Sequence, residues 1–316
     1  MLAWLLRHST LCMAGSVVVG LLLQDLARLF APVVVYVATA TMFLSLVRLD
    51  TKVFLQHARR PGLAIAIIGW TTLVVPLLVL ALVHALPLPS AVAAGILLIA
   101  ATPPIVSVAA YCVFLGTDAA LLTLVSIPAT ALCVLSLPAF AAWAPGDLPG
   151  LAFGPLLIRT FIVVGIAMGG AMLVHRFVPR ARIDAAAMPI DGMIIALIVA
   201  TALGIMDGLA AVIAADPVRS ITYFLATFVL NTVLQCLTAL VFVRAGVVYA
   251  GSAALVGGFR NMALLLGLVI GRVGPELQLF LVMAQIQLFV MPALMRPVYA
   301  LAGVTRYARG TSIGNR

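Results

Sequence analysis

Charged side chains are scarce in this sequence. Asp, Glu, Lys and Arg make up 9% of its 316 residues, whereas soluble domains carry roughly 25%. Hydrophobic residues make up 65%, so too little polar surface is available to cover a water-soluble globule. The apolar stretches are therefore expected to face lipid or one another, as in an integral membrane protein.

Cysteine and histidine are also few. The four cysteines lie inside apolar runs without the pairwise spacing of a metal site, and we expect them to be packing residues: Cys12, Cys112, Cys133 and Cys236. The four histidines lie at or near expected loops: His8, His57, His84 and His175. No nucleophile with a base and no nucleotide-binding loop is recognisable, so we expect neither an enzyme nor a cofactor or metal.

Positive charge is distributed in a way that points away from nucleic acid. The formal net charge is +9, but the basic residues lie in short segments between apolar runs instead of on one basic face. Lipid is the expected partner. Arginine occurs seventeen times and lysine only once, at Lys52, which is typical of a high-GC bacterial genome. The expected location is a bacterial inner membrane.

The apolar runs are continuous, and many reach the roughly 20 residues that a helix needs to cross about 30 Å of hydrocarbon. They predict an all-α transmembrane fold of ten helices, near 9–24, 29–47, 62–85, 90–115, 118–142, 152–175, 189–214, 219–243, 246–270 and 277–303. When successive loops are assigned to opposite sides of the membrane, one side receives twelve Lys and Arg residues and the other receives three. The positive-inside rule then predicts that both termini are cytoplasmic.

The two halves of the chain have helix breaks at matching positions, which indicates an internal repeat. The fourth span is interrupted at Thr102-Pro103-Pro104 and the ninth at Gly257-Gly258, and Pro104 and Gly258 stand 154 residues apart. Each break falls in the fourth helix of a five-helix half, and five is odd, so the second half must enter from the opposite side. These features predict two inverted-topology repeats, 1–146 and 147–316, within one transporter unit. Helices 4 and 9 should cross at the midplane, where transporters bind substrate.

The two breaks are expected to create polar backbone inside the membrane. Proline removes a backbone donor, glycine permits unwound chain, and the half-helix N-termini near Ile105 and Asn261 should present N–H groups to an anion. The simpler interpretation of a single break is a kink in a packed helix, but two matched breaks favour a site.

Arg260 is the strongest candidate for a functional residue, because an arginine in the middle of a span costs roughly 2.5–3.5 kcal/mol to insert into a membrane. Its alternative role is an ion pair with Asp207, for which Arg159 competes; we expect Arg159 to pair with Asp207. Asn261 could equally serve interhelical packing. Asp118 and Asp191 fall near span ends. We expect each to be a helix cap, and the alternative role is that of a proton relay.

At its two broken helices the sequence resembles the bile acid sodium symporter family. The family's Pro-Gly-Gly-Thr-Ala-Ser-Asn break corresponds to residues 102–108, followed by Gly116 and Asp118, with Ser126 and Thr130 at its hydroxyl positions. Its Glu-x-Gly-x-Gln-Asn corresponds to residues 256–261. The resemblance implies a panel domain of helices 1, 2, 6 and 7, a core domain of the others, and substrate between them beside the crossing.

The sequence differs from the family at the residues that bind sodium. Family members hold two sodium ions with oxygens around the crossing, but here Val256, Val108 and Arg260 replace the Glu, Asn and Gln. Sodium sites need several oxygen ligands and usually a carboxylate, so these sites look dismantled, with a fixed guanidinium in place of a mobile cation. The cysteine of the related arsenite exporters is missing, so that activity is not expected.

The sequence thus predicts a secondary transporter of a small organic anion that works by alternating access without the family's sodium sites. The expected substrate-binding residues are Thr102, Ile105, Ser107, Gly258, Arg260 and Asn261, positioned by the broken-helix residues Pro103, Pro104 and Gly257. Proton coupling is left open. The alternatives are an exporter resembling the auxin efflux carriers, which share the architecture, and a membrane scaffold without transport.

Overall fold

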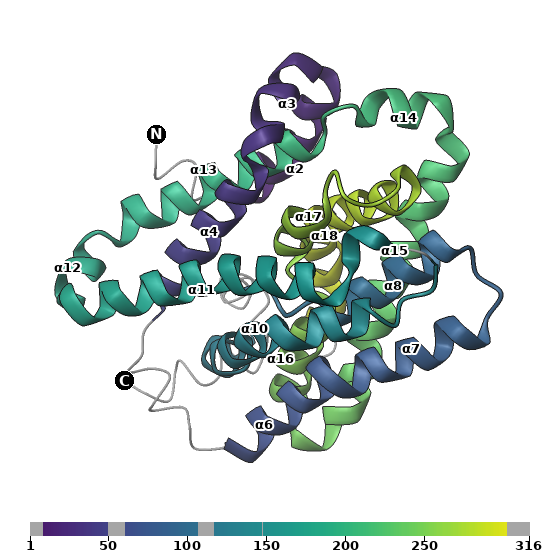
Figure 1. Ribbon diagram of the computed structural model, residues 1–316. Coiled ribbons are helices and arrows are strands. Elements are labelled where there is room, and N and C mark those ends of the chain that lie inside the picture. Colours follow the sequence, from purple (N-terminus) through teal and green to yellow (C-terminus); the bar gives the residue numbers. More distant parts are fainter. Residues whose placement is uncertain (1–8, 50–60, 107–116, 147, 302–316) are drawn as a thin grey trace. The chain divides into compact units, whose positions relative to one another are not determined.

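The computed structural model describes residues 9–49, 61–106, 117–146 and 148–301, and in these ranges every named element is a helix (Figure 1). The elements before residue 147 are α2 (Ser9–Leu22), α3 (Gln24–Phe30), η1 (Ala31–Val33), α4 (Val34–Arg48), α6 (Pro61–Gly69), η2 (Trp70–Val74), α7 (Val75–Ala85), α8 (Ser90–Ala101) and α10 (Ala119–Ala141). Those after it are η3 (Pro149–Leu151), α11 (Phe153–Phe177), α12 (Arg180–Ala185), α13 (Ala187–Ile205), α14 (Leu209–Ala215), α15 (Pro217–Phe242), η4 (Val243–Ala245), α16 (Val247–Gly258), α17 (Met262–Val269) and α18 (Pro275–Leu301).

Helix length and composition in the described ranges agree with a multi-pass membrane protein. Six helical segments are long and apolar enough to cross a membrane, and α8 and α16 are shorter apolar helices. In α11 the apolar side chains of Ile158, Phe161 and Ile166 are about 60% exposed, as expected of residues that face lipid. The all-helical fold is therefore confirmed, and six of its helices are long and apolar enough for a multi-pass membrane protein, while the count of ten spans and the inverted repeat stay predictions.

The chain forms two compact units. The first contains the described parts of residues 1–49, 147–225 and 262–289. In it, α13 packs along α2, α3 and α4, and α11 and α17 also pack on α4 (Figure 1). The helices that the family resemblance assigns to the panel domain all lie in this unit, together with α17 and most of α18, which it assigns to the core.

The second unit contains the described parts of residues 50–146, 226–261 and 290–316. Here α7 packs on α8, and α10 contacts α6, α8 and α16. The unit thus brings together both predicted helix breaks, because α8 ends at Ala101 and α16 ends at Gly258.

One expected span is interrupted where the sequence analysis placed continuous helix, and another is continuous but contains an irregular turn. The span 189–214 ends as α13 at Ile205 and resumes as α14, because Gly208 adopts a positive φ of 72° that a right-handed helix excludes. The span 62–85 contains the π-helical turn η2 in its middle. This turn proves central to the site.

Candidate functional site

The two broken helices meet at their breaks. Pro104 and Arg260 form an isolated antiparallel bridge. The Ile105 amide donates to the Phe259 carbonyl at 2.9 Å, and the Asn261 amide donates to the Pro103 carbonyl at 2.8 Å. Because the amide N–H is missing at Pro103 and Pro104, these residues cannot continue a helix but can still accept hydrogen bonds through their carbonyls. The two breaks are thus in direct contact, while the predicted crossing of helices 4 and 9 at the midplane stays a prediction, because residues 107–116 lie outside the described residues.

Arg260 extends from this contact between the breaks into a cluster of backbone oxygens. Its Nε donates to the Gly257 carbonyl at 2.9 Å, and its Nη1 donates to the Thr71 and Thr102 carbonyls, each at 3.1 Å. We call these three oxygens the carbonyl cage. Thr102 caps the C-terminus of α8 and Gly257 lies in the last turn of α16, so the guanidinium lies where two helix dipoles are negative.

The third oxygen of the cage, on Thr71, was missed by the sequence analysis. In the π-helical turn η2 the Val75 amide donates to the Trp70 carbonyl, five residues back. The next donor in that register would be residue 76, a proline without an N–H, so the Thr71 carbonyl is left for Arg260. Pro76, in the middle of an apolar span, was the signal that could have pointed to this free carbonyl.

The two glycines at the end of α16 allow this helix to approach α15 closely. A Cβ on Gly257 would collide with the Thr238 side chain, and a Cβ on Gly258 would collide with the side chains of Gln235 and Asn231. Thr238 also accepts a hydrogen bond from the Trp70 indole at 3.1 Å, next to Thr71. The glycines are therefore required by packing. The helix continues through both of them and is interrupted only after Gly258, so their expected role as unwound backbone is wrong.

Amide side chains of α15 continue the polar contacts behind the break. Asn231 donates to the Gly258 carbonyl at 2.9 Å, and Gln235 donates to the Asn231 side-chain oxygen at 2.5 Å. The Tyr299 hydroxyl lies 3.4 Å from the Gln235 side-chain oxygen and 3.3 Å from the Gly251 carbonyl oxygen. All of these residues lie in the second unit, so the end of α16 is held by side chains from α15 and α18.

Arg260 is the one charged residue among the described residues that are buried. It is 1% exposed, and no carboxylate lies within 4.0 Å of its guanidinium in the described ranges. Its Nη2 atom is buried and makes no hydrogen bond there. The site therefore combines an uncompensated positive charge with two unused N–H donors, and a buried donor without a partner costs about 1–3 kcal/mol.

The other predicted ligands are more restricted than the sequence implied. The amides of Ile105 and Asn261, expected to face an anion, donate instead to carbonyls of the opposite break. The Thr102 hydroxyl donates to the Leu98 carbonyl at 2.7 Å. Ser107 lies outside the described residues. Their roles as ligands stay predictions, and for Ile105 and Asn261 they would require the bridge between the breaks to open.

The expected pair of Arg159 and Asp207 is wrong. Arg159 donates instead to three carbonyls, those of Pro155, Gly150 and Leu268, at 2.8–3.1 Å. Leu268 lies at the end of α17, so Arg159 satisfies a helix C-terminus just as Arg260 does. Asp207 lies 3.9 Å from Arg28, at the exposed end of α13.

The two other acidic residues differ from each other. Asp118 is the N-cap of α10 and accepts from the amides of Ala120 and Leu121, so its expected role as a cap is confirmed. Asp191 is not a cap. It forms a bidentate ion pair with Arg48, with N–O distances of 2.6 and 3.1 Å.

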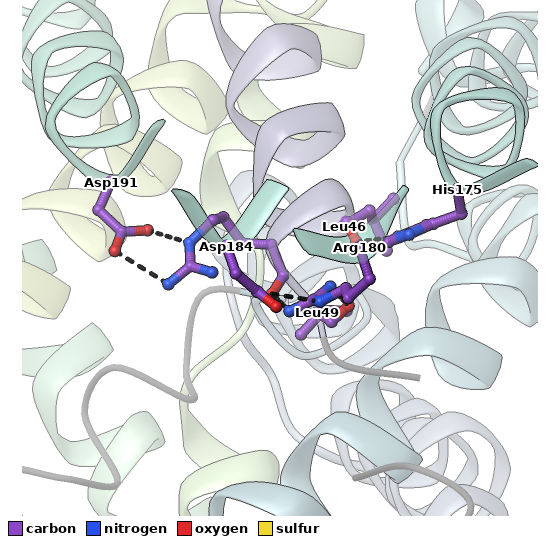
Figure 2. A network of polar contacts seen from close by, with 7 residues as sticks. Leu46, Leu49, His175, Arg180, Asp184 and Asp191 are labelled. Carbon is purple, nitrogen blue, oxygen red and sulfur yellow. Dashed lines mark hydrogen bonds and ion pairs between the residues drawn. The ribbon is translucent and has the colours of Figure 1, made fainter. Parts of the chain in front are cut away.

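This ion pair belongs to a polar network around the C-terminus of α4 (Figure 2). The His175 ring lies 3.2 Å from the Leu46 carbonyl, and Arg180 donates to the Leu49 carbonyl at 2.7 Å while pairing with Asp184. The free carbonyls at the end of α4 thus receive partners from neighbouring helices of the first unit.

Comparison with known proteins adds no family assignment: no protein-family model matches the chain, and no curated protein matches it.

Proposed function

We propose that the chain is a secondary transporter of a small organic anion, working by alternating access and without sodium. The observation that carries this proposal is the environment of Arg260. Its buried guanidinium fills the carbonyl cage and keeps one nitrogen without a partner. The bile acid sodium symporter resemblance at the same two breaks supports the class of transporter.

Sodium independence follows from the use of the carbonyl oxygens. In secondary transporters, unwound backbone and half-helix C-termini supply oxygens to coupling cations. Here the oxygens of Thr102 and Gly257, at the ends of α8 and α16, already accept from Arg260. A side-chain cation that cannot dissociate therefore occupies the position where a mobile ion would be expected.

An anionic substrate follows from the charge that remains. A lone guanidinium in a low-dielectric interior attracts a negative charge far more strongly than it would in water. The unbonded Nη2 supplies two donors for a charge-assisted hydrogen bond to a carboxylate. Because Arg260 is 1% exposed, a substrate can reach Nη2 only after the protein changes conformation, as alternating access requires.

A thermal-stability screen of the purified protein tests the proposal. Carboxylates should raise the melting temperature by mass action, equally in choline and in sodium buffer, because the folded state binds them. In Arg260→Gln the shift should disappear, whereas Arg244→Gln, which changes an exposed arginine in η4, should behave like wild type. A membrane scaffold without a substrate site would show no carboxylate-dependent shift in any of the three proteins.

A further inference from the structure

We infer that the site at Arg260 accepts a substrate with a single negative charge, such as a monocarboxylate, and discriminates against dicarboxylates. The inference rests on the proposed anion transport and narrows it to one charge class. Two properties of the site carry it, the balance of buried charge and the number of donors that remain.

The buried charge balances only one carboxylate. Among the described residues that are buried, Arg260 alone is charged, so the interior carries a charge of +1 before substrate binds. A monoanion brings the total to zero. A dianion would leave one negative charge in a low dielectric without a counter-charge, and an unpaired charge there costs much more than an unpaired neutral group.

The donor count leads to the same limit. A guanidinium has five N–H donors, and three of them are used by the carbonyls of Thr71, Thr102 and Gly257. The two remaining donors belong to one nitrogen, Nη2, which suits one carboxylate group. A second carboxylate placed near the same guanidinium would meet the negative ends of the cage dipoles, which repel it.

Four small probes of similar size separate charge from shape. Butyrate and monomethyl succinate carry one negative charge at neutral pH, succinate carries two, and butyramide carries none. Binding is measured as the shift in melting temperature of the full-length protein in sodium-free buffer. The two monoanions should bind at least about tenfold more tightly than succinate and butyramide, which corresponds to about 1.4 kcal/mol for the unbalanced charge.

The Arg260→Gln variant provides the internal check. Without the guanidinium, the preference for a monoanion over butyramide should fall by at least about tenfold or reverse, because the charge that created it is gone. Arg244→Gln should keep the wild-type order of the four probes. A variant that only unfolded more easily would shift all four melting curves together and would leave the order unchanged, which would count against the inference.

The remaining outcomes are distinguishable. If succinate binds the wild-type protein as tightly as monomethyl succinate, the single-charge inference is overturned while the proposed anion transport stands. If none of the three carboxylates binds, the inference and the proposed function both fail. If both monoanions bind and Arg260→Gln loses that preference, both are supported.

Discussion

The Nη1 atom of Arg260 lies 3.1 Å from the carbonyl oxygen of Thr71, a residue 189 positions earlier in the chain. The same nitrogen bonds the Thr102 carbonyl. One side chain therefore joins three irregular places in three apolar segments: the π-helical turn η2, the end of α8 and the end of α16. Each place exposes a carbonyl that would otherwise lack a partner in the apolar interior.

Close packing at the end of α16 can be tested with alanine. Gly257→Ala should destabilise the protein by about 1–3 kcal/mol, because the new methyl group would collide with Thr238 and force α15 away. Gly169→Ala in α11 is the matched control, since no heavy atom outside its own helix turn lies within 4 Å of its added Cβ. Thermal unfolding of both variants measures the difference, and equal melting temperatures would show that α15 and α16 are not in close contact.

Arg159 and Asp207 should act independently, since each has other partners. The effects of Arg159→Gln and Asp207→Asn on the free energy of unfolding should therefore add to within about 0.3–0.5 kcal/mol. Arg159→Gln should destabilise the protein more than Asp207→Asn, because it leaves the Leu268 and Gly150 carbonyls without their donor. If the double variant loses less stability than the two single variants together, Arg159 and Asp207 would form the pair that the sequence suggested.

Arg48 and Asp191 should be coupled instead. Their side chains are 27% and 37% exposed, so solvent screens the pair and a double-mutant cycle of Arg48→Gln and Asp191→Asn should give about 1 kcal/mol. The comparison is Arg28 with Asp207, separated by 3.9 Å and with an arginine 75% exposed, for which the coupling should be close to zero. Similar couplings for the two pairs would mean that the short bidentate geometry of Arg48 and Asp191 does not persist in the membrane.

Topology is a separate prediction from the loop charges. Reporter fusions after Arg316 and in the segment with Arg59 and Arg60 should both report the cytoplasm, because twelve Lys and Arg residues are assigned to that side. Only three are assigned to the other side, so a fusion near Arg272 should report the opposite compartment. A periplasmic signal at Arg316 would change the number of spans.

The sequence was most informative where backbone chemistry limits the choices. Pro103-Pro104 cannot continue an ordinary helix, and Gly257-Gly258 immediately precede the end of α16, so both breaks could be located to within a few residues. Their pairing followed from the similar halves of the chain. A mid-span arginine could likewise be recognised as exceptional from its position alone. These features depend on residue type and need no tertiary information.

Partner choice was harder to predict, because it depends on distances that periodicity does not contain. A carboxylate partner was expected for Arg159, but Arg159 donates to backbone carbonyls at a helix end, as Arg260 also does. The Thr71 carbonyl is available only because a π-helical turn precedes Pro76. Asp191 looked like a cap in sequence, yet it lies within reach of Arg48 from another helix.

Lysine at position 260 separates the two tasks of the guanidinium. An ammonium has three donors, as many as the carbonyl cage has oxygens, so Arg260→Lys should retain most of the stability. It would then have no donor left for the substrate. Arg260→Gln should lose both the stability from the carbonyl cage and the binding of substrate, because an amide has two donors and no charge to balance the cage and the anion.

Transport by reconstituted protein in liposomes tests the central claim most directly. The tracer is the radiolabelled carboxylate that stabilises the protein most strongly, and its flux is compared with choline or sodium on both sides of the membrane. We predict equal flux of wild-type protein in the two salts, and a flux at least about tenfold lower for both Arg260→Lys and Arg260→Gln, because each lacks the charge-assisted contact made by Nη2. Strict dependence on sodium in the wild type, or undiminished flux in Arg260→Gln, would contradict the account that Arg260 replaces a mobile cation and binds the substrate.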